Sequence, residues 1–185
     1  MVVVGPPDSI LGFVEPTIQL RDANVDDEEL LWHVLNYAGG DPDAMLSVDE
    51  LRSDPALARY VEGWGRSGDA GAIATEGGLE IGAAWFRLFS AATPGYGFVA
   101  EDVPELAIFL EPAARGRGVG RALMHRLSGI AYASGFPTLS LSVRQNNHPA
   151  LHLYLDLGYE PVEPGATTTS ITLTAATYPA ARAGK

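Results

Sequence analysis

The sequence predicts an α/β domain in which helices flank a central mixed sheet. Segments with alternating or continuous apolar residues, typical of strands, are interspersed with segments whose apolar residues recur at helical spacing. The length of 185 residues suits one domain, which we expect over residues 17–178, between an irregular leader (1–16) and a mobile tail (179–185). One strand–helix–strand unit, over about 106–143, requires parallel pairing, so the sheet is expected to be mixed.

In the N-terminal half, alternation marks the strand and capping residues mark the helices. Residues 17–21 alternate as a half-buried strand does. Asp26 precedes an apolar stripe at helical spacing, which it can cap. Ser47 and Glu50 form a capping-box pattern, and Gly77-Gly78 is a hairpin turn. The expected elements are a strand at 17–21, a helix from Asp26 to about 38, a helical region at 47–64 bent at Pro55, and hairpin strands at 72–75 and 80–88.

In the C-terminal half, strands alternate with helices. An apolar strand precedes Gly118, and a helical pattern follows it until Gly135. Pro149 at a first helical position and Gly158 just past the end bracket a short helix. The expected elements are strands at 106–110, 138–143, 159–162 and 170–174, with helices after Gly118 and at 149–157.

Composition excludes several classes of protein. Twelve basic and 23 acidic residues give a net charge of −11, whereas a global nucleic-acid binder is expected to be basic. The absence of cysteine excludes disulfides, thiolate metal sites and a cysteine nucleophile. The sequence has no signal-peptide pattern and no apolar run long enough to span a bilayer. We therefore expect a cytoplasmic protein with no nucleic-acid partner and no membrane partner.

One basic segment interrupts this acidity. Residues 112–155 contain five arginines and no Asp or Glu, so the remaining seven basic and 23 acidic residues give −16. The segment suggests a local anionic ligand that bears phosphate, although a solvated helix face is the alternative. The acidic residues, many of them in the first two expected helices, would attract a cationic substrate or serve solubility alone.

The most informative motif is the strand, turn and helix over 106–121. Its glycines at positions 116, 118 and 120 allow successive backbone N–H groups to converge, and the helix N-terminus adds partial positive charge. Together they suit a diphosphate, although a plain glycine-rich turn is the alternative. A Walker A loop is excluded because the only lysine is Lys185. The Rossmann pattern fails because Arg121 occupies its third glycine position.

A second motif follows the strand at 138–143, and the two together resemble the GCN5-related N-acetyltransferase (GNAT) superfamily. The segment Arg115–Gly120 matches the acetyl-CoA signature Arg/Gln-x-x-Gly-x-Gly/Ala at each specified position. Asn147, Ala150 and Tyr154 match its Asn-x-x-Ala-x-x-x-Tyr pattern, and residues 157–159 supply the Leu-Gly-aromatic sequence that follows. The resemblance is specific over about 106–160, whereas the N-terminal half fits only the order of elements.

The resemblance implies a GNAT-like acyl-CoA N-acyltransferase fold, in which strand 106–110 splays from strand 138–143 to open a V-shaped cleft. Acetyl-CoA would be the co-substrate, and no metal is expected. Its pantetheine arm would pair with backbone groups of Ile108, Phe109 and Leu110. Asn147 would also bond the arm, or would cap the following helix. The residues expected around the diphosphate are Arg115, Gly116, Arg117, Gly118, Val119, Gly120 and Arg121.

The resemblance also implies two catalytic side chains. Tyr154 matches the general acid, a phenol that is neutral at pH 7 and can protonate the departing thiolate; the alternative is a core aromatic. Glu105 is the nearest candidate for the general base that some members carry on strand 106–110; the alternative is an exposed acid at the strand end. Members that act on ribosomal-protein N-termini carry a glutamate where this sequence has Ser142, so that acceptor class loses support.

The function expected from these features is transfer of an acetyl group from acetyl-CoA to a primary amine, by direct attack in a ternary complex. The acceptor would be a small cationic molecule or a peptide. A catalytically silent acyl-CoA-binding module and a nucleotide-binding protein remain alternatives, and the resemblance allows a homodimer. Four aromatic residues of the first two helical regions would line an acceptor pocket or belong to the core: Trp32, Tyr37, Tyr60 and Trp64.

Overall fold

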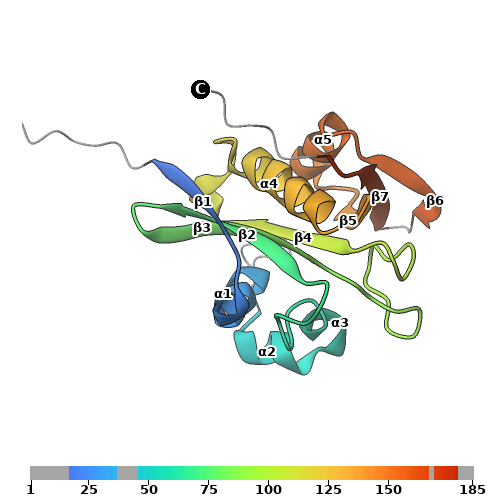
Figure 1. The fold of residues 1–185 in the computed structure, drawn as a ribbon, viewed down its shortest axis with the longest axis horizontal. Coiled ribbons are helices and arrows are strands. Elements are labelled where there is room, and N and C mark those ends of the chain that lie inside the picture. Colours follow the sequence, from blue (N-terminus) through green and yellow to red (C-terminus); the bar gives the residue numbers. More distant parts are fainter. Residues whose placement is uncertain (1–16, 37–45, 167–168, 179–185) are drawn as a thin grey trace, which may run out of the picture.

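The computed structural model describes residues 17–36, 46–166 and 169–178, so the expected leader and tail lie outside the described residues. One mixed sheet has the strand order β1-β2-β3-β4-β5-β7-β6, with helices on both faces (Figure 1). This arrangement confirms the predicted fold class. The strands are β1 (Ile18–Asp22), β2 (Ala70–Glu76), β3 (Leu79–Arg87), β4 (Glu105–Leu110), β5 (Thr138–Arg144), β6 (Glu160–Ala166) and β7 (Ser170–Ala176). The helices are η1 (Val25–Asp27), α1 (Glu28–Leu35), α2 (Val48–Ser53), α3 (Pro55–Ala58), η3 (Pro112–Ala114), α4 (Val119–Ala133) and α5 (His148–Asp156).

The sheet opens between β4 and β5. These two strands run parallel, as the strand–helix–strand unit required, but their register contains a single pair, Glu105 with Ser140. Along its other edge, β4 pairs with β3 over its whole length, from Leu110 opposite Gly82 to Glu105 opposite Arg87. Among the described strands, the edge of β4 that faces β5 therefore has no partner beyond Glu105, and the predicted splay of the two strands is confirmed.

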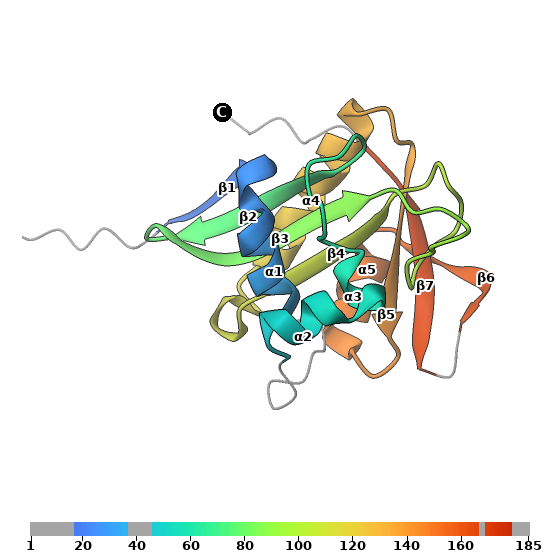
Figure 2. The same cartoon turned by 90° about the horizontal axis from the view of Figure 1, so that it is seen from below.

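Each face of the sheet carries its own apolar cluster. Helices α4 and α5 cover one face, and α1, α2 and α3 cover the other (Figures 1 and 2). Along β4 the side chains alternate: Leu106 and Ile108 join the cluster of α4 and α5, whereas Ala107 and Phe109 join the cluster of α1–α3. By the same alternation, Glu105 faces the α1–α3 side.

The first helix begins two residues earlier than expected. Asn24, rather than Asp26, caps the start at η1, and its side chain accepts a hydrogen bond from the Asp26 amide at 2.8 Å. Asp27 is buried, and its carboxylate is paired with the Arg21 guanidinium at 2.7 Å, which compensates for the loss of water. Helix α1 ends at Leu35, and the expected end near residue 38 lies outside the described residues.

The second helical region is two short helices rather than one bent helix. The predicted capping box of Ser47 and Glu50 starts α2. Asp54 has an extended backbone that ends α2, and its carboxylate caps α3 by accepting from the Ala56 amide at 2.8 Å. Helix α3 then ends at Ala58, and residues 59–65 form turns instead of continuing the helix.

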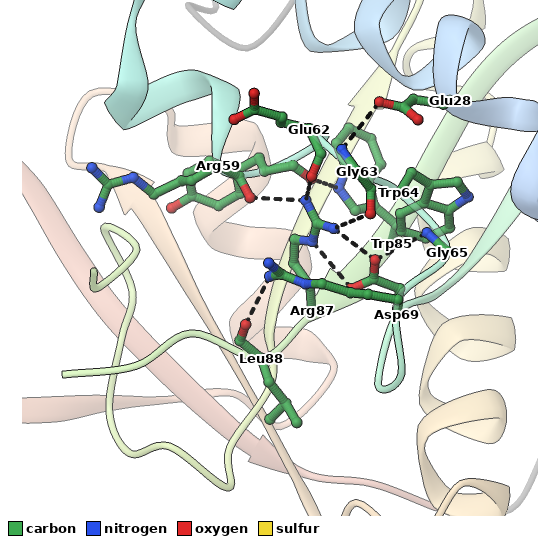
Figure 3. A network of polar contacts seen from close by, with 12 residues as sticks. Glu28, Arg59, Glu62, Gly63, Trp64, Gly65, Asp69, Trp85, Arg87 and Leu88 are labelled. Atoms are coloured by element: carbon green, nitrogen blue, oxygen red, sulfur yellow. Dashed lines mark hydrogen bonds and ion pairs between the residues drawn. The ribbon is translucent and has the colours of Figure 1, made fainter. Parts of the chain in front are cut away.

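A buried ion pair explains why this segment leaves the helical path. The side chains of Arg87 and Asp69 are fully buried and lie 2.6 Å apart. The Arg87 guanidinium also donates hydrogen bonds to the carbonyl oxygens of Arg59 at 2.9 Å and Glu62 at 3.1 Å (Figure 3). A buried cation requires such partners, and they hold residues 59–69 against β3.

None of the described helices is long and apolar enough to cross a membrane.

Candidate active site

The turn between β4 and α4 has the backbone geometry of an anion-binding site. Gly116 and Gly118 have φ of 71° and 81°, and a Cβ at either position would meet no atom within 4 Å. Within the described residues, the amides of 116–121 have no backbone acceptor; the Ala122 amide, which donates to Gly118 O at 3.0 Å, starts the helical ladder. These amides and the dipole of the 15-residue α4 fit a diphosphate.

The positive charge of the basic segment 112–155 is partly neutralised in the folded protein. Arg115 is exposed at the start of the turn, and Arg144 is exposed at the end of β5. The other three arginines form ion pairs with acids from outside the segment: Arg117 with Glu76 at 2.5 Å, Arg121 with Asp156 at 3.0 Å and Arg126 with Asp22 at 2.9 Å. Three of the five positive charges of the segment are therefore balanced within the fold, and backbone amides provide most of what the turn offers an anion.

The open edge of β4 begins immediately after Glu105, where β4 and β5 separate. Ile108, Phe109 and Leu110 are half-buried there, whereas Leu106 is buried. The backbone groups that β5 leaves unpaired can receive an extended arm in the way that a sheet edge receives a strand. The Phe109 ring lies against Trp85 on the α1–α3 side, with 5.7 Å between the ring centroids.

Asn147 caps α5, which confirms the alternative that we expected for it. Its side-chain oxygen accepts from the Ala150 amide at 3.3 Å, and Pro149 occupies the first turn. The amide nitrogen of the same side chain has two donors that the cap does not use. Asn147 is exposed, so those donors can reach a ligand.

Tyr154 is a core aromatic in its surroundings. Its side chain is buried in the cluster of α4 and α5, and its ring lies 5.9 Å from that of Tyr159. The same cluster contains Ile108 of β4 and Val143 of β5, the strands that border the gap. Burial raises the pKa of Tyr154 above its ordinary value, so the phenol stays protonated at neutral pH and keeps a proton to donate.

Glu105 is buried, and the alternative of an exposed strand-end acid is wrong. Only 3% of the residue is exposed, and it lies at the last pairing point of β4 and β5. Its Oε1 accepts from the Tyr60 hydroxyl at 2.6 Å and the Gly97 amide at 2.8 Å. Its Oε2 is buried without a hydrogen-bond partner among the described residues. Burial raises the pKa of Glu105 to about 7, against the opposing effect of these hydrogen bonds.

The side-chain partner of Glu105 is Tyr60, for which the sequence left two roles open, in an acceptor pocket or in the core. Tyr60 precedes Glu105 by 45 positions, and no local pattern links the two. The interpretation of the helical aromatics as core residues is confirmed for Trp32, Tyr60 and Trp64, which are all buried; Tyr37 lies outside the described residues. Tyr60 is nevertheless more than a packing residue, because its hydroxyl contacts the candidate base.

The acidic residues of the first two helices are partly neutralised. Asp27 pairs with Arg21, and Glu29 pairs with Arg52 at 2.5 Å. Asp26, Asp49 and Glu50 remain exposed, whereas Asp41 and Asp43 lie outside the described residues. The described residues contain no group of three or more His, Asp or Glu placed to hold a metal ion.

Known proteins resemble this chain in both sequence and fold. The sequence model of the acetyltransferase (GNAT) family matches residues 41–159. A mycothiol acetyltransferase of Amycolatopsis mediterranei (strain U-32) is 35% identical over 117 residues, which cover 62% of this chain and 36% of that protein. The chain thus spans about a third of the length of the curated relatives it matches.

Two solved structures share the fold at low sequence identity. The structure of yncA from Salmonella typhimurium with its cofactor acetyl-CoA has a TM-score of 0.64 at 20% identity, and covers 91% of this chain and 98% of that one. The phosphinothricin acetyltransferase of Sinorhizobium meliloti in complex with acetyl-CoA has a TM-score of 0.62 at 21% identity, with 87% and 89% covered. Because the family match extends over more than half of the sequence, the chain belongs to the acetyltransferase (GNAT) family.

Proposed function

We propose that this protein transfers the acetyl group of acetyl-CoA to the primary amine of a small cationic molecule or peptide. Family membership supports acetyl-CoA-dependent acetyltransferase activity. The observation that carries the mechanism is the state of Glu105: a buried carboxylate at the point where β4 and β5 separate, with one oxygen that has no partner among the residues described. A carboxylate in this state is a proton acceptor rather than a structural counter-ion, because both of its hydrogen bonds come from neutral donors.

The chain offers one group for each part of acetyl-CoA, which would supply an activated acetyl thioester. The amides of 116–121 would bind its diphosphate, with Arg115 alongside. The open edge of β4 at 108–110 would pair with the pantetheine arm, and the Asn147 amide would donate to it. The amides of 116–121 have no backbone acceptor among the described residues, whereas the Arg115 Nε donates to the Leu110 carbonyl oxygen at 3.4 Å, a long contact that a ligand could replace.

Glu105 would act as the general base. A pKa of about 7 is close to the pH at which the protein would work, where a base combines sufficient ionisation with sufficient basicity. Because only 3% of Glu105 is exposed, the proton of the amine would reach Oε2 through one intervening water. The amine nitrogen forms its bond to the thioester carbon as this proton leaves.

Tyr154 would act as the general acid. As the carbon–sulfur bond breaks, its phenol, which is protonated at neutral pH, would donate a proton to the sulfur. Tyr154 belongs to the cluster of α4 and α5, and Glu105 faces α1–α3. The base and the acid would thus serve the two sides of the reacting carbon from opposite faces of the sheet, without exchanging a proton directly.

The acceptor side would favour a cation of small size. The net charge of −11 and the exposed Asp26, Asp49 and Glu50 supply the negative potential. The curated relatives are named for mycothiol, a small molecule, which agrees with a small acceptor.

The test combines calorimetry with acetyl-CoA and an assay of thiol release over a panel of amines. Binding together with amine-dependent thiol release supports the proposal. Binding without release for any amine would identify a silent acyl-CoA-binding module, and no binding of acetyl-CoA or CoA would overturn the proposal altogether. Activity that does not fall with rising ionic strength would remove the attraction of a cationic acceptor.

A further inference from the structure

We infer that Tyr60 is the positioning residue for Glu105: its hydroxyl and the Gly97 amide together occupy Oε1, so Oε2 is the oxygen that takes up the proton. This inference rests on the proposed function and deepens it, because it names both the reactive oxygen and the side chain that selects it. Three features of the described residues carry it: the hydrogen bonds of Oε1, the surroundings of Oε2 and the frame that holds Tyr60.

When Glu105 is ionised, both hydrogen bonds at Oε1 are donated to the carboxylate. The Tyr96 amide donates to the Tyr60 hydroxyl oxygen at 2.8 Å, so that oxygen acts as an acceptor on one side. The hydroxyl proton is then free to point at Glu105 Oε1, 2.6 Å away, where the Gly97 amide also donates at 2.8 Å. Two donors use both lone pairs of Oε1, and a proton cannot be added there without breaking one of them.

In contrast to Oε1, Oε2 receives no hydrogen bond from the described residues. This oxygen is also buried. A Cβ on Gly95 would collide with it, so a residue without a side chain is required above it. Negative charge on an unpartnered buried oxygen is costly, and protonation at Oε2 relieves that cost while leaving both bonds at Oε1 intact.

The frame around Tyr60 fixes the backbone from which the phenol extends toward Glu105. The Tyr60 backbone carbonyl accepts from the Trp85 Nε1 at 2.8 Å. The buried Arg87 guanidinium holds the carbonyl oxygens of Arg59 and Glu62 on either side of it (Figure 3). Trp85 and Arg87 both belong to β3, the strand that pairs with β4, so the hydroxyl and the carboxylate are positioned by the same pair of strands.

Few charged groups face Glu105 within the described residues. Arg59, beside Tyr60, lowers the pKa of Glu105 by its charge. Arg87 lies opposite Glu105 in the register of β3 and β4, and its charge is balanced by Asp69 at 2.6 Å. The loop before β4 contributes backbone amides. The Tyr60 hydroxyl is thus the main side-chain group that stabilises the ionised carboxylate against burial, and its removal is expected to raise the pKa of Glu105.

The test is a titration of the Glu105 carboxyl carbon by ¹³C NMR in the full chain, with the signal assigned by its loss in Glu105→Gln. In Tyr60→Phe we expect the midpoint to move to higher pH, with proton affinity increased about tenfold by the loss of one hydrogen bond to a charged group. The control is Tyr96→Phe, which removes the hydroxyl of an exposed ring but keeps the Tyr96 amide, and should leave the midpoint unchanged. An unchanged midpoint in folded Tyr60→Phe would overturn the inference.

The pH dependence of kcat/KM separates this inference from the proposed function. If Glu105 is the base, the pH of half-maximal kcat/KM moves with the NMR midpoint in Tyr60→Phe. A moved midpoint with an unmoved rate profile would support the role of Tyr60 and overturn that of Glu105 in catalysis. Should Tyr60→Phe fail to fold, the Tyr60 ring signals of the wild type serve instead. They should titrate with Glu105 and lose that titration in Glu105→Gln, and ring signals that do not titrate would overturn the inference.

Discussion

The diphosphate turn and the Glu105 site differ in their exposure to solvent and in the groups that form them. The turn is exposed at 116–118 and at Arg121, and the backbone amides of 116–121 have no backbone acceptor in the described residues. Glu105 is buried, and it depends on side chains and amides from the segment after α3 and from the loop before β4. The first site is ready for an anion from solvent. The second holds an acid at a pKa of about 7 because burial removes most of its contact with solvent.

The comparison shows which kind of site a motif can reveal. The turn consists of consecutive residues whose conformation depends on glycine, so its pattern is readable over six positions. The Glu105 site joins residues 45 positions apart, and one of its donors, Gly97, contributes only its backbone. A substitution should therefore act on substrate affinity at the turn and on chemistry or stability at Glu105.

The largest expected effect is that of Glu105→Gln on turnover. Gln can accept the same hydrogen bonds but cannot take up a proton, so kcat should fall by about 10²- to 10⁴-fold with little change in the Kd of acetyl-CoA. In the wild type, kcat/KM should rise with pH and level off above about 7. The matched control is Glu101→Gln, an exposed acid of the loop before β4, which should keep full activity. Normal turnover in Glu105→Gln would remove this residue from the chemistry.

The next effect is on stability. The folded state raises the pKa of Glu105 from 4.5 to about 7, so between these values the folded protein holds a proton that the unfolded chain has lost. Rising pH should then lower the free energy of unfolding, by about 3 kcal/mol from this one group, most of it lost between pH 5 and pH 7. Urea unfolding of wild type and Glu105→Gln at pH 5 and pH 8 measures it. Equal pH dependence in the two proteins would show that Glu105 is not buried as described.

A smaller change is expected for Tyr154→Phe. Loss of the phenolic proton should lower kcat by about ten- to a hundredfold, while acetyl-CoA affinity stays within a factor of two, since general acid catalysis acts on the departing sulfur rather than on binding. Tyr159→Phe is the control, because that ring is equally buried and lies 5.9 Å away. Equal kcat for both variants would leave Tyr154 as a core residue only.

The smallest effect is expected at the turn, and it should appear in affinity alone. Gly118 has a φ of 81°, so Gly118→Ala strains the backbone by about 1–2 kcal/mol and adds a methyl group where the ligand would lie. We expect the Kd of acetyl-CoA to rise about tenfold. Gly135→Ala introduces the same strain at φ 84°, past the far end of α4, and should leave Kd unchanged. A similar Kd for both variants would contradict the placement of the diphosphate.

The fold followed from the sequence where neighbouring residues carry the signal. The Ser47–Glu50 capping box, the Gly77-Gly78 turn and the strand–helix–strand unit all appear as predicted, because each depends on residues a few positions apart. The errors occur where distant groups intervene. Arg87 of β3 takes the carbonyl oxygens that would have extended α3, and acids from other elements neutralise three arginines of the basic segment.

The sequence by itself determined the glycine turn, the apolar strand that precedes it, and the family to which the chain belongs. Only the tertiary structure decided that Glu105 is buried, that Tyr60 and Gly97 occupy one of its oxygens, and that the other oxygen has no partner in the described part of the chain. The reason is physical. Backbone conformation is set by local sterics, whereas the proton affinity of a carboxylate is set by whatever the packing of remote segments brings within a few ångströms of it.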